Sequence, residues 1–257
     1  MSSPPAGVLR AFGVEGPARA LAGGRGTSWL AGGLVLKPEA GPVVEELDGL
    51  RSGGFRLAAP ARTRDGSFAC EGWSATRWVA GAEADYAQES TWRDILAAGR
   101  AFHRAVAHVR RPGFLAARQD WWARGDRAAW GERSVRFRPE FAGVASWLAG
   151  ALAPLGEPQL VHADLTQNVL FAPGLPPAII DISPYWRPAA YAEGVVVADA
   201  LCWHDARASL LEAVGVSVPA VARALLFRMA TTNERDDVPD VRDEARRYER
   251  AAAAIGR

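Results

Sequence analysis

The chain has 257 residues, 49% of them hydrophobic, and a formal net charge of +1 at pH 7. This length can bury a sizeable core in one large domain or two small lobes, and the near-zero charge gives no electrostatic reason to expect a nucleic-acid partner. Two cysteines are too few for a disulfide framework or a zinc cluster. We find neither a signal-peptide pattern nor an apolar run of roughly 18 residues that would span a membrane, so we expect a cytoplasmic protein without a membrane partner.

Short apolar runs separated by glycine fill the first 80 residues and predict a small antiparallel sheet. The five predicted strands are 18–22, 28–31, 34–37, 55–59 and 67–79. An Asp65-Gly66 turn is expected to join the last two as a hairpin. Residues 1–11 carry proline and serine and are predicted to be a loose end.

A glycine-rich turn over residues 23–27 separates the first two predicted strands. Gly24 and Gly26 allow backbone N–H groups to approach a phosphate closely, and Thr27 follows them. The turn is not a P-loop, because no Gly-Lys-Ser/Thr sequence follows it. Most glycine-rich turns are plain hairpins, so this turn alone is weak support for a nucleotide site.

Lys37 ends the third predicted strand and is the only lysine among the 30 basic side chains. Lysine is a compact point charge and arginine a planar fork, so a single ammonium group favours a functional role over compositional chance. A helix is predicted over residues 42–50, with proline near its first turn and glycine beyond its end. Glu46 would lie beside the apolar face of this helix and is our candidate partner for Lys37, with a solvated acid as the equal alternative.

The rest of the chain is predicted to be mainly helical, with apolar residues recurring at spacings of three and four. The predicted helices are 91–109, 141–153, 191–203, 209–214, 219–231 and 241–255. His103 and His108 lie on the first of these and are expected to be surface or interhelix residues. Asp199 lies within an apolar helix, where an unpaired carboxylate would cost several kcal/mol, so we expect it to have a partner.

Residues 110–139 combine eight arginines with several tryptophans. The simplest interpretation is a helical region whose tryptophans pack inward. A second is a wall of an acceptor pocket for an anionic or flat molecule. Stacking on single-stranded nucleic acid is a third, which the three interleaved acids and the neutral chain disfavour.

Three polar side chains lie in or next to a group of short predicted strands between residues 159 and 182. Asp164 and Asn168 lie on a loop, and Asp181 lies in the last of the predicted strands 159–162, 168–171 and 178–182. Phosphoryl transfer needs a carboxylate that orients the proton of an attacking hydroxyl, and an amide oxygen and a second carboxylate that hold Mg²⁺. Each residue alone is more often structural, but the ordered set favours a kinase site.

The segment HADLTQNVLF, followed by IIDIS, resembles the catalytic loop and metal-binding strand of the aminoglycoside phosphotransferase and choline kinase group. The chain is also similar to an actinobacterial branch of that group, in which a DLTxNVLF loop precedes IDxSPYWRP. The resemblance covers most of the chain and is sharpest over residues 159–201. It implies that Asp164 is the catalytic base, that Asn168 and Asp181 bind Mg²⁺, and that His162 supports the loop.

The same resemblance implies a role for the N-terminal third of the chain. The glycine-rich turn would cover the nucleotide, and Lys37 would bind its phosphates. The backbone of Arg77 and Val79 would contact the adenine of ATP, and Asp199 would brace the catalytic loop. Two features depart from the group: three residues rather than four separate Asp164 from Asn168, and Ile-Ser rather than Phe-Gly follows Asp181.

We therefore expect an α+β, two-lobed protein-kinase-like fold, with a small antiparallel-sheet N-lobe over residues 1–80 and a mainly helical C-lobe over residues 81–257. The expected activity is ATP-dependent transfer of a phosphate to a hydroxyl of a small-molecule acceptor, with Mg²⁺. The shortened loop keeps open a pseudokinase that binds nucleotide or a partner without catalysis. Protein kinase activity is disfavoured, because no long segment with an Ala-Pro-Glu-like end follows Asp181.

Overall fold

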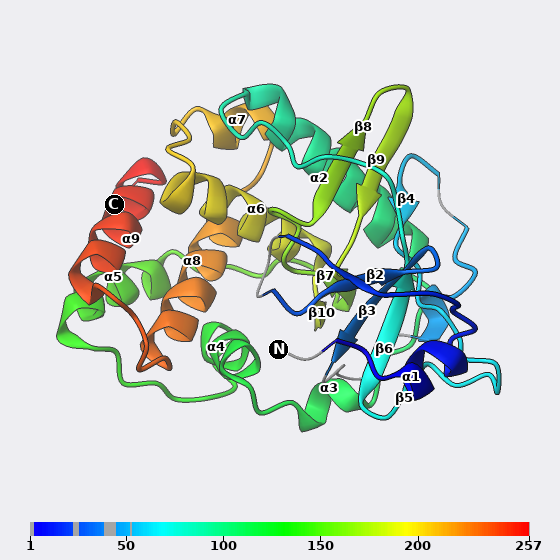
Figure 1. The fold of residues 1–257 in the computed structure, drawn as a ribbon. Coiled ribbons are helices and arrows are strands. Elements are labelled where there is room, and N and C mark those ends of the chain that lie inside the picture. Colours follow the sequence, from blue (N-terminus) through cyan, green and yellow to red (C-terminus); the bar gives the residue numbers. More distant parts are fainter. Residues whose placement is uncertain (1–2, 23–25, 39–44, 52, 257) are drawn as a thin grey trace. The chain divides into compact units, whose positions relative to one another are not determined.

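The computed structural model describes residues 3–22, 26–38, 45–51 and 53–256. It divides into two compact units. Unit 1 comprises Met1–Ala82 and Leu170–Asp181, and unit 2 comprises Glu83–Val169 and Ile182–Arg257 (Figure 1). A short segment from the middle of the chain, 170–181, therefore groups with the N-terminal unit, whereas the division expected from the sequence has a single boundary after residue 80.

Unit 1 contains the antiparallel five-stranded sheet that the glycine-punctuated sequence predicts. Its order is β1-β2-β3-β6-β5, and every pair in it is antiparallel. Gly32 and Gly33 form the turn between β2 and β3, both at positive φ, which glycine adopts without strain. The strands are β1 (Arg19–Ala20), β2 (Trp29–Ala31), β3 (Leu34–Pro38), β6 (Trp73–Arg77) and β5 (Ala69–Cys70).

The N-terminal residues are part of the core of unit 1, so the predicted loose end is wrong. Residues Ala6–Ala11 form helix α1. Val8 on this helix is fully buried, and Phe12 just after it is nearly so; both pack in one cluster with Leu36 and Trp73 of the sheet. Burial of apolar side chains outweighs the weak helix signal of this proline-bearing segment.

The expected strand 55–59 meets this sheet only at its end, where Arg77 N–H donates to Ala59 O and the following Pro60 forms an isolated bridge with Thr76. Its residues Arg56–Leu57 form β4, which pairs in parallel with β9 (Leu175–Ile179) in a separate three-stranded sheet of order β4-β9-β8. β8 is Val169–Ala172. The Asp65-Gly66 turn does form, but the hairpin of the main sheet turns at Glu71-Gly72 instead, where both residues have positive φ.

The helix predicted over residues 42–50 falls partly outside the described residues, which omit 39–44. Its described end is a single 3-10 turn, η1 (Glu45–Leu47). Leu47 is buried, and Glu46 is exposed. β9 also begins earlier than expected, because the prolines at 176 and 177 are part of the strand. The fixed φ of proline suits an extended chain, and the pairing of β9 with β4 begins only at Ala178, after the prolines.

Unit 2 is built around two long helices, α6 and α8, which are buried along most of their length and pack against each other (Figure 1). At Gly194 on α6 a side chain would collide with the backbone of Ala220 on α8, so the absence of a Cβ permits this close crossing. The helices are α2 (Glu89–Ala105), α3 (Phe114–Ala117), α4 (Trp121–Ala129), α5 (Pro139–Gly150), α6 (Ala189–Trp203), α7 (Leu210–Val214), α8 (Val218–Asn233) and α9 (Val241–Ala254).

A two-stranded ribbon lies among these helices. β7 (Gln159–His162) is the strand predicted from the sequence, and it pairs antiparallel with β10 (Pro184–Arg187), a strand that the sequence patterns did not indicate. None of the described helices is long and apolar enough to cross a membrane.

Candidate functional site

In unit 1, the only lysine of the chain meets one of the predicted metal ligands. Lys37 Nζ lies 2.8 Å from Asp181 Oδ1. The two side chains are 35% and 56% exposed, so water screens the pair and its contribution to stability is at most about 1 kcal/mol. A weak, accessible ion pair of this kind can be exchanged for contacts to a bound anion or cation. The expected pair between Lys37 and Glu46 is not formed in the described part of the chain.

The β8–β9 hairpin carries Asp181 to Lys37, and three contacts hold it in unit 1. β4 pairs with β9, as described above. Arg56 donates from Nε to Pro176 O (2.8 Å) and from Nη1 to Ala80 O (2.7 Å). Ala82 and Phe171 exchange two backbone hydrogen bonds of 2.9 Å each. Asp181 itself has φ of 48°, a left-handed conformation that aspartate tolerates better than most residues.

In unit 2, the loop after β7 brings Asp164 and Asn168 together. Asn168 Nδ2 donates to the backbone O of Asp164 at 2.7 Å, and Asn168 N–H donates to Leu165 O at 2.9 Å. Gln167 takes up the tight turn with φ of 66°, and its N–H donates to the hydroxyl of Tyr86 at 2.7 Å. The loop with three intervening residues therefore closes on these three hydrogen bonds.

A buried arginine from α8 fixes the carboxylate of Asp164. Arg228 Nη2 donates to Asp164 Oδ1 at 2.7 Å and to Asp199 Oδ2 at 2.6 Å, while Arg228 Nε donates to Asp199 Oδ1 at 2.8 Å. Arg228 and Asp199 are 6% and 4% exposed. Burial raises the pKa of Asp199, although Arg228 opposes this. Burial alone would lower the pKa of Arg228, but the two carboxylates together raise it well above its ordinary value.

Two histidines support the strand before this loop. His162 N–H donates to Nε2 of His103 at 3.2 Å, and Ser183 N–H donates to Nδ1 of His162 at 3.2 Å. Both histidines are buried, which places His103 against β7 instead of at the surface, while His108 is exposed. Burial, and then the charge of a protonated His162, lower the pKa of His103 to about 3, so His103 is neutral at physiological pH.

The remaining predicted nucleotide contacts lie in unit 1. Gly24 is outside the described residues, whereas Gly26 has a positive φ and precedes Thr27 in the approach to β2. Arg77 N–H donates to Ala59 O at 2.8 Å. Val79 makes no backbone hydrogen bond with another residue that the structure describes.

Residues 33–182 match the sequence profile of the phosphotransferase enzyme family. The chain belongs to this family. No curated protein sequence is similar enough to match the chain. The matched range spans β3 with Lys37, the loop with Asp164 and Asn168, and Asp181, and it leaves out the glycine-rich turn and Asp199.

Solved structures of similar fold include aminoglycoside phosphotransferases and a choline/ethanolamine kinase family protein. An aminoglycoside phosphotransferase from Alicyclobacillus acidocaldarius has a TM-score of 0.63 at 15% identity, over 99% of this chain and 94% of that one. A thermostable mutant of the aminoglycoside phosphotransferase APH(4)-Ia has a TM-score of 0.59 at 16% identity, over 96% of each chain. A choline/ethanolamine kinase family protein from Mesorhizobium loti has a TM-score of 0.50 at 18% identity, over 95% and 90%. The likeness confirms the predicted protein-kinase-like α+β fold.

Two residues of unit 2 that contribute to the site were not identified from the sequence. Arg228 interrupts the apolar run of α8, and a charge inside such a run was a signal that it needs a buried partner. Tyr86 left no such signal, because its hydroxyl serves a backbone N–H of a loop 81 residues away.

We expect replacement of Arg228 by methionine to destabilise the protein by about 3–5 kcal/mol, because two carboxylates lose their partner and Asp199 stays buried. The double variant Arg228→Met/Asp199→Leu should recover a large part of this loss, since apolar groups then fill the space. Urea unfolding of the wild type, Arg228→Met, Asp199→Leu and the double variant measures the coupling energy between Arg228 and Asp199. Equal stability of the single and double variants would contradict a mutual dependence.

Acid should weaken the fold through His103. Its pKa is about 6.5 in an unfolded chain and about 3 in the folded protein, so the stability from the neutral ring is complete above pH 6.5 and is lost as the pH falls toward 3. Near pH 5 this loss has a slope of about 1.4 kcal/mol per pH unit. His103→Gln keeps an acceptor for His162 N–H without titrating and should flatten the curve of unfolding free energy between pH 6 and 4.

The exposed His108→Gln variant is the matched control for this measurement and should follow the wild-type curve. Parallel curves for wild type and His103→Gln would show that His103 does not titrate on unfolding in this range.

Proposed function

We propose that this phosphotransferase family member transfers the γ-phosphate of ATP to a hydroxyl of a small-molecule acceptor. The observation that carries the proposal is the ion pair of Lys37 with Asp181 at 2.8 Å. It joins the single ammonium group of the chain to an acid that the family resemblance assigns to metal binding. Both side chains are accessible, and neither is needed to hold the fold, so a ligand can take over their contacts.

Structural neighbours support a nucleotide as one substrate. The APH(4)-Ia structure is a ternary complex with AMP-PNP and hygromycin B, and a spectinomycin phosphotransferase of similar fold is a complex with ADP and spectinomycin. In this chain the Val79 backbone has no partner within the described residues and suits the expected adenine contact. Arg77 is less suited as a donor, because its N–H already donates to Ala59 O.

Asp164 is the group we assign to the acceptor. Arg228 holds its Oδ1, which fixes the carboxylate in one orientation and leaves Oδ2 to accept the proton of an acceptor hydroxyl. The hydroxyl oxygen then forms a bond to the γ-phosphorus while the bond from that phosphorus to the bridging oxygen breaks and ADP leaves. Orientation by a buried guanidinium keeps the carboxylate in place before the substrate arrives, which is where such catalysis gains most of its rate.

The residues fit a magnesium ion held partly by substrate. Asn168 donates its amide N–H to the Asp164 backbone oxygen, so its Oδ1 is turned away and accepts no hydrogen bond from the described residues. One amide oxygen from Asn168 and one carboxylate from Asp181, with phosphate oxygens and water, make a donor set that Mg²⁺ favours. No three His, Cys, Asp or Glu side chains gather into a metal site among the described residues. When bound, the ion supplies charge neutralisation at the phosphates.

The non-catalytic alternative drew on the shortened spacing between Asp164 and Asn168. The loop of this length closes with a direct hydrogen bond between these two residues, and this supports the catalytic proposal over the alternative.

We expect ATP binding to depend on Mg²⁺ and on Asp181. Calorimetry with and without Mg²⁺ on wild type and Asp181→Ala measures both dependences. The wild type should bind ATP more tightly with Mg²⁺, and Asp181→Ala should lose that gain, because one of its two protein ligands is missing. Wild-type protein that binds no ATP in either condition would contradict the phosphotransferase assignment.

Asp164→Asn should retain ATP binding and lose turnover by about 10²-fold or more, the usual size of a general-base contribution. The measurement is ATP consumption in the presence of a panel of hydroxyl acceptors. Asp94→Asn removes an exposed acid on α2 and serves as the matched control. Unchanged turnover in Asp164→Asn would exclude Asp164 as the base.

A further inference from the structure

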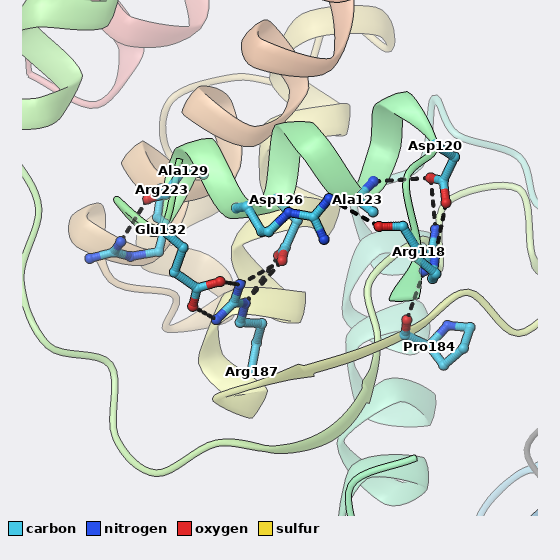
Figure 2. A network of polar contacts seen from close by, with 10 residues as sticks. Arg118, Asp120, Ala123, Asp126, Ala129, Glu132, Pro184, Arg187 and Arg223 are labelled. Atoms are coloured by element: carbon cyan, nitrogen blue, oxygen red, sulfur yellow. Dashed lines mark hydrogen bonds and ion pairs between the residues drawn. The ribbon is translucent and has the colours of Figure 1, made fainter. Parts of the chain in front are cut away.

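A cavity of about 210 Å³ lies in unit 2 between α3, α4 and β10. It continues into an open hollow of about 580 Å³, and both are lined by Ala116, Arg127 and Glu132. Figure 2 shows the network of polar contacts at its wall, which joins α4 to β10. The charged residues of the smaller cavity are Arg111, Arg118, Arg127, Arg187, Asp126 and Glu132, so positive charges outnumber negative ones.

Two of the four arginines have their charge compensated inside the protein. Arg187 donates to Asp126 Oδ2 (2.7 Å) and to Glu132 Oε1 (2.5 Å), as Figure 2 shows. Arg118 donates to both carboxylate oxygens of Asp120 at 3.0 Å. The side chain of Arg187 is only 14% exposed, and these contacts hold it rigidly in the wall. These arginines therefore build the cavity and are not available to a ligand.

The other two arginines have no such partner. Arg127 donates only to neutral oxygens, the backbone O of Arg118 at 3.0 Å and Oε1 of Gln119 at 3.5 Å. Arg111 is exposed and makes no ion pair with another described residue. The charge of Glu132 acts on both, but Glu132 is already hydrogen bonded to Arg187, so positive charge remains in excess at this cavity. Such an excess of guanidinium groups is a site for an anion, because guanidinium matches the geometry of carboxylate and phosphate oxygens.

A chain of aromatic contacts connects the lining of this cavity to the arginine that holds Asp164. Arg228, which holds Asp164, packs 5.2 Å from the ring centre of Phe227. Phe227 contacts Tyr185 at 5.7 Å between ring centres, and Tyr185 lines the cavity under the guanidinium of Arg118. The charge of Asp164 is among the groups that act on the Tyr185 hydroxyl, whose pKa burial raises.

We propose that Arg111 and Arg127 bind a carboxylate or phosphate group of the acceptor, so that the acceptor is an anionic hydroxyl compound and not a polycationic aminoglycoside. The assignment of the bound anion to the acceptor rests on the proposed phosphotransferase function. The anion site itself does not depend on that function. A polyamine would meet an excess of positive charge at this wall, and an acid-bearing molecule would be attracted to it.

The test of the site is a titration of inorganic phosphate followed by calorimetry. Wild-type protein should bind it, and Arg111→Gln and Arg127→Gln should each bind about tenfold more weakly or worse, since each loses one charge-assisted contact. Arg127→Lys keeps the charge and should retain most of the affinity. Arg104→Gln removes an exposed arginine from α2 and should bind like wild type. Melting temperatures of all variants show whether any of them misfolds.

Phosphate affinity that is unchanged in Arg111→Gln and Arg127→Gln would overturn the site. So would a loss of binding in Lys37→Ala alone, because the phosphate would then belong to the predicted nucleotide site.

The test of the acceptor class compares ATP consumption with hydroxy acids, sugar phosphates and hygromycin B. Acid-bearing acceptors should be preferred, and Arg127→Gln should raise their KM about tenfold with kcat retained. Turnover of hygromycin B alone would overturn this inference and leave the phosphotransferase function standing. Phosphate binding without ATP consumption for any acceptor would support the anion site and count against the proposed function.

Discussion

The guanidinium of Arg228 is the interaction on which the candidate catalytic loop depends. It is buried between the carboxylates of Asp199 and Asp164, and it links helix α6, helix α8 and the loop after β7. A buried charge without a partner would cost several kcal/mol, so the position of each member is fixed by the other two. Removing Arg228 leaves the buried carboxylate of Asp199 without its partner.

The ion pair of Asp199 with Arg228 explains why the buried helices α6 and α8 each carry a charged side chain in their interior. Their remaining buried residues are almost all apolar, and the close crossing at Gly194 holds the two helix axes at a fixed separation. That packing places Asp199 and Arg228 within hydrogen-bond distance, and Arg228 then reaches the loop. The rigid packing of the two helices therefore fixes the orientation of the Asp164 carboxylate. A fixed orientation is what a general base requires.

Local patterns predicted much of the fold and the polar residues of the site. The β7 strand, the antiparallel sheet of unit 1 and the loop with Asp164 and Asn168 follow from short-range features, namely β-branched runs and glycine turns. The failures are long-range. The strand β4 was assigned to the wrong sheet, because its partner β9 lies about 120 residues further along the chain. Glu46 was chosen for Lys37 from helix geometry, but the hairpin brings in Asp181 instead.

The two ion pairs of the candidate site differ in how far they are exposed to water, and this difference distinguishes a structural pair from a pair that can exchange its contacts for a ligand. The pair of Arg228 with Asp199 is buried, is joined by two hydrogen bonds that Arg228 donates, and cannot be opened without leaving a charge in the core. The pair of Lys37 with Asp181 is partly exposed, and water already competes for both groups. A ligand phosphate or a metal ion can therefore replace the second pair at little cost, whereas it cannot replace the first. By this criterion Arg228 is a permanent part of the framework, and Lys37 with Asp181 is the pair of unit 1 that we propose for ligand binding.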